Sequence, residues 1–256
     1  MHHAWLLTGP KGVGKATLAW RAARFLLATP PASDTSLFGA SPPADSLDIA
    51  PDHPVARRIA ALSEPGLLPI RRPWDTEKKR FKTQITVDEV RRLNGFFGLS
   101  AAEGGHRVVI VDSADEMNTA AANALLKVLE EPPRDSVLFL VSHRPARLLP
   151  TIRSRCRELR LGTLSSDALA DAVTQAGGTA ESSRALAELS GGSVGEALRL
   201  AALDGPGIYA AVVDLISGAP SMDRQKALAI AEKAAQRGAE ERLLSLIHIS
   251  EPTRLQ

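Results

Sequence analysis

An α/β fold built on a parallel sheet with flanking helices, followed by an all-helical segment, is the architecture that the sequence predicts. A glycine-rich loop at residues 9–15 lies between a short apolar run and a segment of helical periodicity. Apolar runs of strand length then alternate with helical segments, and from Leu164 onward only helical periodicity remains. Strands that alternate with helices form βαβ units, in which the strands are parallel.

The first elements surround the glycine-rich loop. Ala4–Leu7 is expected to be a strand, and Ala16–Ala28 is expected to be a helix with its apolar residues on one face. Pro30–Ala50 is rich in Pro, Ser, Ala and Asp and is expected to be a surface excursion. A short helix is expected near residues 55–63.

Segment 71–82 carries several cations and is expected to be an exposed hairpin. The cations are Arg71, Arg72, Lys78, Lys79, Arg80 and Lys82. A run of this kind is either a solvated loop or a DNA-binding patch, and the sequence favours the solvated loop.

The next elements complete the predicted sheet. Three apolar runs are interpreted as strands buried on both faces, and they span residues 108–111, 137–141 and 159–161. Helices are expected at residues 87–97, 119–129 and 148–152. The first of them starts at a capping box formed by Thr86 and Glu89, and Pro132 and Pro133 stop the second.

Beyond the sheet, three helices are expected to form a small unit, and further helices follow a glycine-rich break at residues 205–207. The expected ranges are 167–176, 182–189 and 194–203, then 208–216 and 223–237. The sequence therefore predicts an α/β domain at residues 1–162, a three-helix domain at 163–204, and the start of a further helical domain at 205–243.

The last residues change in character abruptly. Leu244–Arg254 breaks the preceding Ala, Glu and Arg pattern, and it matches one reading frame of a common transposase-type sequencing-library adapter. Residues 244–256 are therefore expected to be a non-native tail without a part in the fold.

The composition is that of a globular protein in a reducing compartment. Hydrophobic residues are 44% and charged residues 23% of the 256 residues. Cys156 is the only cysteine, which excludes an internal disulfide framework and a multi-cysteine zinc site and fits a cytoplasmic location. No apolar run approaches the roughly 18 residues of a membrane span, and the start lacks the features of a secretory signal. A net charge of +2 is too small to indicate nucleic-acid binding by itself.

The glycine-rich loop matches the pattern G-x-x-x-x-G-K of nucleotide-binding loops. Its residues are Gly9, Pro10, Lys11, Gly12, Val13, Gly14 and Lys15. Glycines let successive backbone N–H groups point at phosphate oxygens, and the following helix adds the positive end of its dipole. Lys15 is expected to reach the β- and γ-phosphates.

Two positions depart from the pattern of active ATPases. The full loop pattern ends in Ser or Thr, whose hydroxyl holds Mg²⁺, but this chain has Ala16, and Thr17 is turned away by about 100° on a helix. Asp112 ends the apolar run 108–111 and is expected to bind Mg²⁺ through water. The next residue is Ser113 where active members of the related class carry Glu, and a hydroxyl is not a general base at neutral pH.

Two further motifs follow in order along the chain. Asn123–Pro133 reads as an Ala/Leu-rich helix that ends in two acidic residues and two prolines, and residues 154–156 read Ser-Arg-Cys. Together with the glycine-rich loop and the strand that ends at Asp112, they resemble the motifs of bacterial DNA polymerase III clamp-loader subunits of the AAA+ P-loop family. The match covers about residues 5–203, and it is closer to the delta-prime family than to the gamma/tau motors.

This resemblance implies an AAA+ module, a helical lid and a helical collar, with a chain that is short at both ends. Arg155 corresponds to an arginine finger that reaches ATP on a neighbouring motor subunit, and Ser142 to the sensor-1 position. Gly195 stands where motor subunits carry a sensor arginine. Because of these departures, the chain's own ATPase activity is expected to be weak or absent, while binding of ATP with Mg²⁺ stays open.

The resemblance also implies a set of partners. They are the gamma/tau motor subunits and the delta subunit, with the sliding clamp and primer–template DNA reached through the complex; no membrane is involved. Many relatives carry four zinc-binding cysteines after the first helix, but residues 30–63 contain none, so no zinc is expected. The chain is expected to act as a stator that completes the ring during DNA replication.

Two alternatives remain. A gamma/tau-type ATPase motor is disfavoured by Ala16, Ser113 and Gly195. A stand-alone P-loop nucleotide kinase would need a substrate lid rich in arginines, and it has no place for the Ser-Arg-Cys motif or for the helix at Leu125–Pro133.

Overall fold

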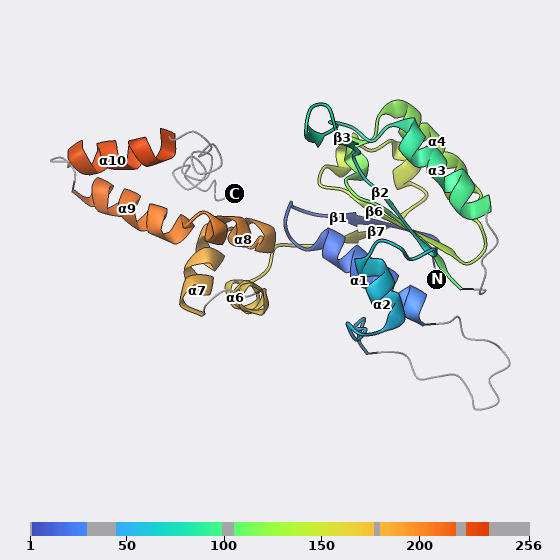
Figure 1. The fold of residues 1–256 in the computed structure, drawn as a ribbon, viewed down its shortest axis with the longest axis horizontal. Coiled ribbons are helices and arrows are strands. Elements are labelled where there is room, and N and C mark those ends of the chain that lie inside the picture. The colour runs from blue at the N-terminus through green and yellow to red at the C-terminus, as the bar shows by residue number, and fades with distance from the viewer. Residues whose placement is uncertain (1, 30–44, 99–104, 177–179, 219–223, 236–256) are drawn as a thin grey trace. The chain divides into compact units, whose positions relative to one another are not determined.

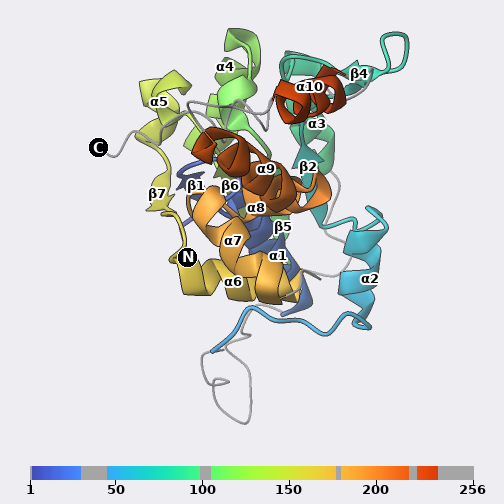
Figure 2. The ribbon, with the colours of Figure 1, turned by 90° about the vertical axis from the view of Figure 1, so that its left-hand side faces the viewer.

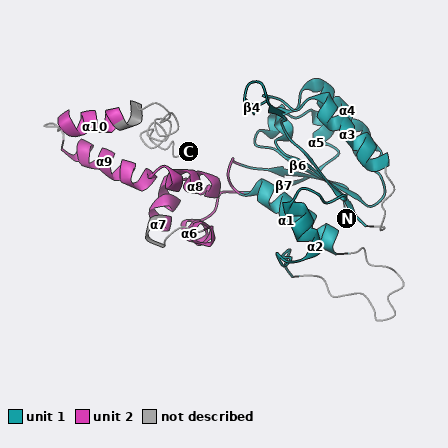
Figure 3. Cartoon of the chain, in the orientation of Figure 1, with its two compact units in different colours: residues 1–9, 14–161 teal, residues 10–13, 162–256 magenta. Residues whose placement is uncertain are grey.

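The computed structural model describes residues 2–29, 45–98, 105–176, 180–218 and 224–235. The chain divides into two compact units, shown in Figure 3. Unit 1 comprises residues 1–9 and 14–161, and unit 2 comprises residues 10–13 and 162–256. The tip of the glycine-rich loop thus belongs to unit 2, although the loop begins and ends in unit 1.

A five-stranded parallel sheet forms the centre of unit 1, which confirms the predicted fold class. In spatial order its strands are β2 (Leu67–Ile70), β5 (Arg107–Val111), β6 (Ser136–Val141), β1 (Ala4–Thr8) and β7 (Arg157–Arg160). The register pairs Leu6 of β1 with Leu140 of β6 and Ile110 of β5 with Phe139 of β6. Because all strands run in one direction, their carboxyl ends meet at a single edge.

Helices cover both faces of this sheet (Figure 1). One face carries α1 (Lys15–Ala28) and α2 (Pro54–Ala60), and the other carries α3 (Val87–Gly98), α4 (Thr119–Glu130) and α5 (Pro150–Arg153). Side chains alternate along the strands, so that Leu7 packs with α1 and α2 whereas Leu6 packs with the second layer. Burial on both faces explains why β5 and β6 are continuous apolar runs.

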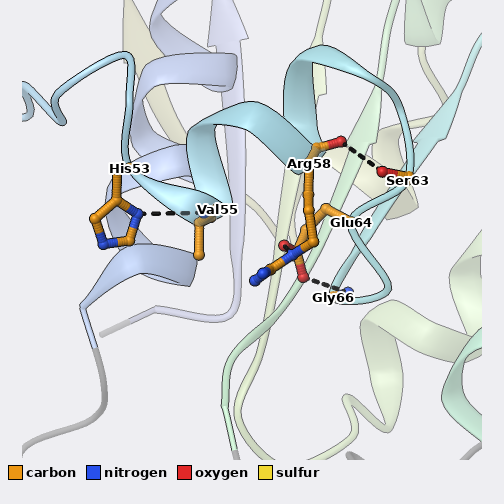
Figure 4. Close-up of polar contacts among 6 residues, drawn as sticks. All are labelled: His53, Val55, Arg58, Ser63, Glu64 and Gly66. Atoms are coloured by element: carbon orange, nitrogen blue, oxygen red, sulfur yellow. Dashed lines mark hydrogen bonds and ion pairs between the residues drawn. The ribbon is translucent and has the colours of Figure 1, made fainter.

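Side chains fix the α2 helix and the turn that follows it (Figure 4). The His53 Nδ1 atom accepts a hydrogen bond from the Val55 N–H at 3.2 Å and so caps the helix. After the helix, Arg58 Nε pairs with a Glu64 oxygen at 2.8 Å, and the other Glu64 oxygen accepts a bond from the Gly66 N–H at 3.2 Å. These bonds direct the chain into β2.

The predicted hairpin is present between β2 and α3. Its strands are β3 (Trp74–Asp75) and β4 (Arg80–Phe81), which pair antiparallel as a separate two-stranded sheet. Figure 2 shows the β3–β4 loop projecting from unit 1.

Unit 2 is helical in the part that the structure describes. Its core lies among α6 (Ser166–Gln175), α7 (Ala180–Leu189) and α8 (Val194–Ala202), and α9 (Gly205–Ser217) and α10 (Arg224–Ala235) follow. The separate domain expected from residue 205 remains a prediction. Most of the expected surface excursion at 30–50 and all of the expected tail at 244–256 lie outside the described residues. No single described helix is long and apolar enough to span a membrane; α8 and α9 pass that test only together, bent by 76° at their break.

Three details of the prediction were wrong. Leu67–Ile70 was not predicted as a strand, but it forms β2 at an edge of the sheet. The strand expected to be buried at 159–161 is β7, whose four residues are all exposed because it lies at the sheet edge and pairs only with β1. The break expected at Gly205–Gly207 is the first turn of α9. Pro206 is tolerated there because the first N–H groups of a helix need no helical partner, and Asp204, at φ +56°, makes the bend instead.

Truncation of Leu125 is expected to destabilise unit 1. Leu125 of α4 is fully buried against the sheet, so Leu125→Ala is expected to lower the free energy of unfolding by about 2–5 kcal/mol. The three tryptophans, Trp5, Trp20 and Trp74, all lie in unit 1, so their fluorescence during urea denaturation reports on this unit.

Leu159→Ala is the matched control for this prediction. Leu159 on β7 is 41% exposed, so its truncation is expected to cost far less than that of Leu125. Equal losses in the two variants would contradict the described packing of α4.

Candidate functional site

The glycine-rich loop connects β1 to α1, where the sequence placed it. Gly9, Gly12 and Gly14 have φ values of +133°, +81° and +93°, which side chains with a Cβ atom rarely adopt. At Gly9 a Cβ atom would also lie 2.1 Å from the Leu161 carbonyl oxygen, so this position excludes any other residue. No side chain caps the start of α1, which leaves its positive end available to an anion.

Lys15 is directed into this loop. Its side chain is almost fully buried, and Nζ donates a hydrogen bond to the Gly9 carbonyl oxygen at 2.7 Å. Burial lowers the pKa of Lys15, and the negative charges of Asp115 and Asp112 partly oppose that shift. The two carboxylates therefore favour the charged form of the loop lysine, which its burial disfavours.

Asp115 is a member of this site that sequence reasoning left without an assignment. It lies in the short 3-10 helix at Ala114–Glu116, and its Oδ1 atom accepts a hydrogen bond from the His143 N–H at 3.0 Å. Asp115 thereby ties the end of β5 to the end of β6. The sequence showed that Asp115 follows the strand that ends at Asp112, but not in which direction its side chain points.

The residue after Asp112 adopts an unusual backbone conformation. Ser113 has φ +61°, in the left-handed region that non-glycine residues rarely adopt. Glu116, a nearby acidic residue, pairs with Arg72 at 2.9 Å. Ser113 therefore carries a hydroxyl where a carboxylate would be needed. The Glu116 carboxylate is paired with Arg72, so it is not free to act beside Asp112.

Ser142 lies at the carboxyl end of β6, as the sequence predicted. Its backbone N–H donates to the Leu7 carbonyl oxygen at 2.9 Å, which fixes it beside the end of β1. The side chain is fully buried, and its Oγ atom has no hydrogen-bond partner among the described residues. A buried hydroxyl without a partner is costly, so this atom is suited to a polar ligand.

Ala16 and Thr17 offer little to a metal ion. Ala16 has no polar side-chain atom, and Thr17 is exposed on the next position of α1. In the part of the chain that the structure describes, no group of three or more His, Cys, Asp or Glu side chains is arranged to hold a metal.

The tip of the loop is hydrogen-bonded to the start of α8, within unit 2. The Gly195 N–H donates to the Gly12 carbonyl oxygen at 2.9 Å, and Ser193 Oγ donates to the Lys11 carbonyl oxygen at 3.1 Å. A Cβ atom at Gly195 would lie 2.9 Å from the Gly12 Cα atom. This backbone contact disfavours any side chain at position 195, arginine included, in this arrangement.

Arg155 belongs to a different part of unit 1. It follows α5, and its guanidinium donates to the Thr151 carbonyl oxygen at 2.9 Å and pairs with Glu130 of α4 at 2.8 Å. The side chain is 36% exposed, so its charge lies at the surface of the unit. The pairing joins the two sequence motifs, and Glu130 is a contributor that sequence reasoning did not single out.

Cys156, beside Arg155, packs against the core. It is half-buried next to the layer that contains α4 and α5, and burial raises the pKa of its thiol to about 11. A thiol of this kind is a poor nucleophile.

Comparisons with known proteins reveal related sequences. The family model described as DNA polymerase III, delta subunit, matches residues 1–165. The delta' subunit of DNA polymerase III from Pseudomonas aeruginosa is 37% identical over 228 residues, which cover 88% of this chain and 62% of that protein. The delta' subunit from Escherichia coli is 35% identical over 156 residues, or 61% of this chain and 41% of that protein.

A gamma/tau subunit is also similar, over a shorter stretch. The DNA polymerase III subunit gamma/tau of Mycobacterium bovis is 30% identical over 157 residues, which cover 60% of this chain and 23% of that protein. The chain matches less than two thirds of the length of each of these relatives.

A methyl group at Gly195 is expected to loosen the loop tip. In Gly195→Ala the added Cβ atom pushes against the Gly12 backbone, so the hydrogen bond to Gly12 is strained. Amide hydrogen exchange at residue 195 is expected to accelerate by about 2- to 10-fold, the equivalent of one net hydrogen bond.

Gly95→Ala is the control for Gly195→Ala. Gly95 lies in α3, and a Cβ atom there meets nothing within 4 Å. This variant is expected to leave exchange at residue 195 unchanged, and unchanged exchange in Gly195→Ala as well would contradict the contact.

Cys156 is expected to react slowly while the chain is folded. A shift of its pKa from 9.0 to about 11 lowers the thiolate fraction at pH 8 by about 100-fold, so disulfide reagents should modify the native thiol far more slowly than the urea-unfolded one. Because the folded chain holds this proton more tightly, the free energy of unfolding should fall as the pH rises from 9 towards 11. Equal rates for native and unfolded chain would refute the burial of this thiol.

Proposed function

The chain belongs to the family of DNA polymerase III delta subunits, within which its similar curated relatives are delta' subunits, and we propose that it serves as the stator of a bacterial clamp loader. In this role it completes the subunit ring and supplies Arg155 to ATP held by a neighbouring motor subunit. The ring then loads the sliding clamp on primed DNA during replication.

The contrast between two sites carries this proposal. The chain's own nucleotide loop keeps Lys15 but has Ala16 in the metal-binding position and Ser113 in the position of the general base. Arg155, by contrast, is intact and lies at the surface of unit 1. A chain that lacks groups for its own hydrolysis but presents an arginine is suited to assist hydrolysis in a neighbour.

The residues at the loop fit a nucleotide that is bound without being hydrolysed efficiently. The open start of α1 and Lys15 would hold the phosphates, and the buried Oγ atom of Ser142 would gain the partner that it lacks among the described residues. Asp112 would face a Mg²⁺ ion through water, which would neutralise phosphate charge. Without a carboxylate at position 113, an attacking water would not be activated.

Arg155 would act on a neighbouring subunit by charge alone. A guanidinium stabilises the charge that develops on the transferred phosphoryl group, and an arginine finger contributes roughly 10³–10⁵ in rate at its site. Its pair with Glu130 holds the side chain in place before assembly. On docking, the guanidinium would exchange part of this contact for the phosphate of the neighbour.

The proposed partners follow from this role. They are the gamma/tau motor subunits, one of which binds the ATP that Arg155 reaches, and the delta subunit; the sliding clamp and primer–template DNA are engaged by the assembled ring. Neither zinc nor a membrane has a part in the proposal, and the location proposed is the cytoplasm.

A gamma/tau-type motor is the alternative that the test must separate. It is favoured by Lys15 and Asp112, which are both retained and interact with each other. In a motor, the chain's own loop would drive hydrolysis, and Arg155 would be secondary.

The distinguishing experiment follows ATP hydrolysis by the assembled loader. The subunit that carries this sequence, at the full length of its gene, is mixed with motor subunits, delta subunit, clamp and primed DNA, as wild type, Arg155→Ala or Lys15→Ala. Loss of the finger should abolish hydrolysis at the adjacent motor site, so Arg155→Ala is expected to reduce the rate sharply and Lys15→Ala to change it little.

Arg153→Ala is the matched control, since Arg153 is an exposed arginine two residues away in α5. A loader assembled with Arg153→Ala is expected to hydrolyse ATP at the wild-type rate. A larger loss in Lys15→Ala than in Arg155→Ala would overturn the stator proposal in favour of the motor.

A further inference from the structure

The β3–β4 hairpin exposes two large aromatic side chains. Trp74 is 53% and Phe81 50% exposed, and they are cross-strand partners whose rings meet edge to face with centroids 5.0 Å apart. Large apolar side chains that remain at the surface as a pair are typical of a binding surface. The proposed ring assembly gives these two residues no role.

Four cations lie on the same hairpin as this aromatic pair, with one exposed carboxylate, Glu77, in the turn. Lys78, Lys79, Arg80 and Lys82 are all exposed, and none of them forms an ion pair with another residue in the described part of the chain. Their charges are therefore available to an external anion.

The hairpin is held in a defined conformation. The Asp75 carboxylate accepts hydrogen bonds from the N–H groups of Glu77 at 3.1 Å and Lys78 at 3.0 Å, and so shapes the turn. At the base, the Lys82 N–H donates to the Pro73 carbonyl oxygen at 2.9 Å. The aromatic rings and the cations are thus presented by an ordered scaffold, which limits the entropy lost on binding.

A cavity of about 320 Å³ lies against the hairpin. Its lining consists of Asp75, Lys78, Arg80, Phe81, Lys82, Thr83, Gln84 and Thr86. The one carboxylate among them, Asp75, accepts hydrogen bonds from the N–H groups of the turn, so the three cations exceed it in charge. The cavity combines positive charge, an aromatic ring and hydrogen-bonding groups, and its volume suits a small organic group. One nucleotide offers the complementary set: a phosphate, a flat base and polar edges.

We propose that the β3–β4 hairpin binds single-stranded DNA. Its cations contact the phosphates, and unstacked bases pack on Trp74 and Phe81, which is how proteins hold single strands without reading their sequence. Aromatic residues and arginine are common in protein–protein interfaces as well, but lysine is depleted there, and three of the four cations are lysines. This excess of lysine favours a phosphate backbone over a protein partner. A duplex keeps its bases stacked, so it would leave the aromatic pair without a partner. The choice of DNA over RNA rests on the proposed function in replication.

The test measures binding of a fluorescent oligo-dT strand to the whole chain by anisotropy, at several salt concentrations. Trp74→Ala is expected to weaken binding by about 5- to 100-fold, the range for loss of one base–aromatic stack. Lys78→Glu is expected to weaken binding and to make the salt dependence shallower, since a phosphate contact is lost. Lys78 is exposed at the turn and its backbone bonds remain, so this variant tests the proposal even if Trp74→Ala disturbs the hairpin.

Two matched controls lie away from the hairpin. Arg57→Glu reverses an exposed cation on α2, and Tyr209→Ala removes an aromatic ring that is 42% exposed on α9. Both are expected to bind oligo-dT like wild type. A blunt duplex of the same length is expected to bind more weakly than the single strand and to be unaffected by Trp74→Ala.

Three outcomes would overturn the inference. The hairpin variants could bind oligo-dT as tightly as the controls, or an oligo-rU strand could bind more tightly than oligo-dT. Hairpin variants that bind DNA normally but no longer assemble with the motor subunits would identify a protein-docking surface instead. This binding assay needs neither ATP nor the assembled ring. A chain that does not bind oligo-dT would therefore leave the stator proposal untouched, and a chain that fails as a stator could still bind oligo-dT.

Discussion

Parallel pairing of β1 with its neighbours is the constraint on which the candidate site depends. The Ser142 N–H binds the Leu7 carbonyl oxygen and the Leu161 N–H binds the Thr8 carbonyl oxygen, so the ends of β6 and β7 are fixed beside the start of the glycine-rich loop. The same register places Asp112 after β5 at this edge, where its N–H binds the Ile70 carbonyl oxygen. The sheet is buried on both faces, so a change in register would displace apolar side chains from the core as well as the site residues. Burial of the core therefore fixes the positions of the site residues.

Electrostatics within the site follow from this arrangement. Lys15 is buried, which disfavours its charge, and the carboxylates of Asp112 and Asp115 offset part of that cost. Arg155 differs from Lys15 because its charge remains at the surface, paired with Glu130. The chain thus keeps one cation buried inside its own loop and another at the surface of unit 1. The proposed division between nucleotide binding at the loop and assistance to a neighbour rests on this difference in environment.

The accuracy of the sequence prediction varied with the strength of the local pattern. β5 and β6 were predicted almost to the residue because burial on both faces imposes continuous apolar runs. β7 was misjudged because hydrogen bonding to β1 alone is enough to form an edge strand, even with exposed side chains. The turn at Gly205–Gly207 was misread because glycine and proline favour both a break and a first helical turn.

The sequence by itself determined the glycine-rich loop, the alternation of strands with helices and the motifs that identify the family, since these depend on local periodicity and on residue types at fixed spacing. It did not predict β2 as a strand. Only the tertiary structure decided which residues complete the site. Asp115 acts on Lys15, Glu130 holds Arg155, and the Gly195 backbone rests against Gly12, although the last two residues lie 183 positions apart in the chain. Contacts of this kind are set by how distant segments pack, and no local pattern of residues encodes them.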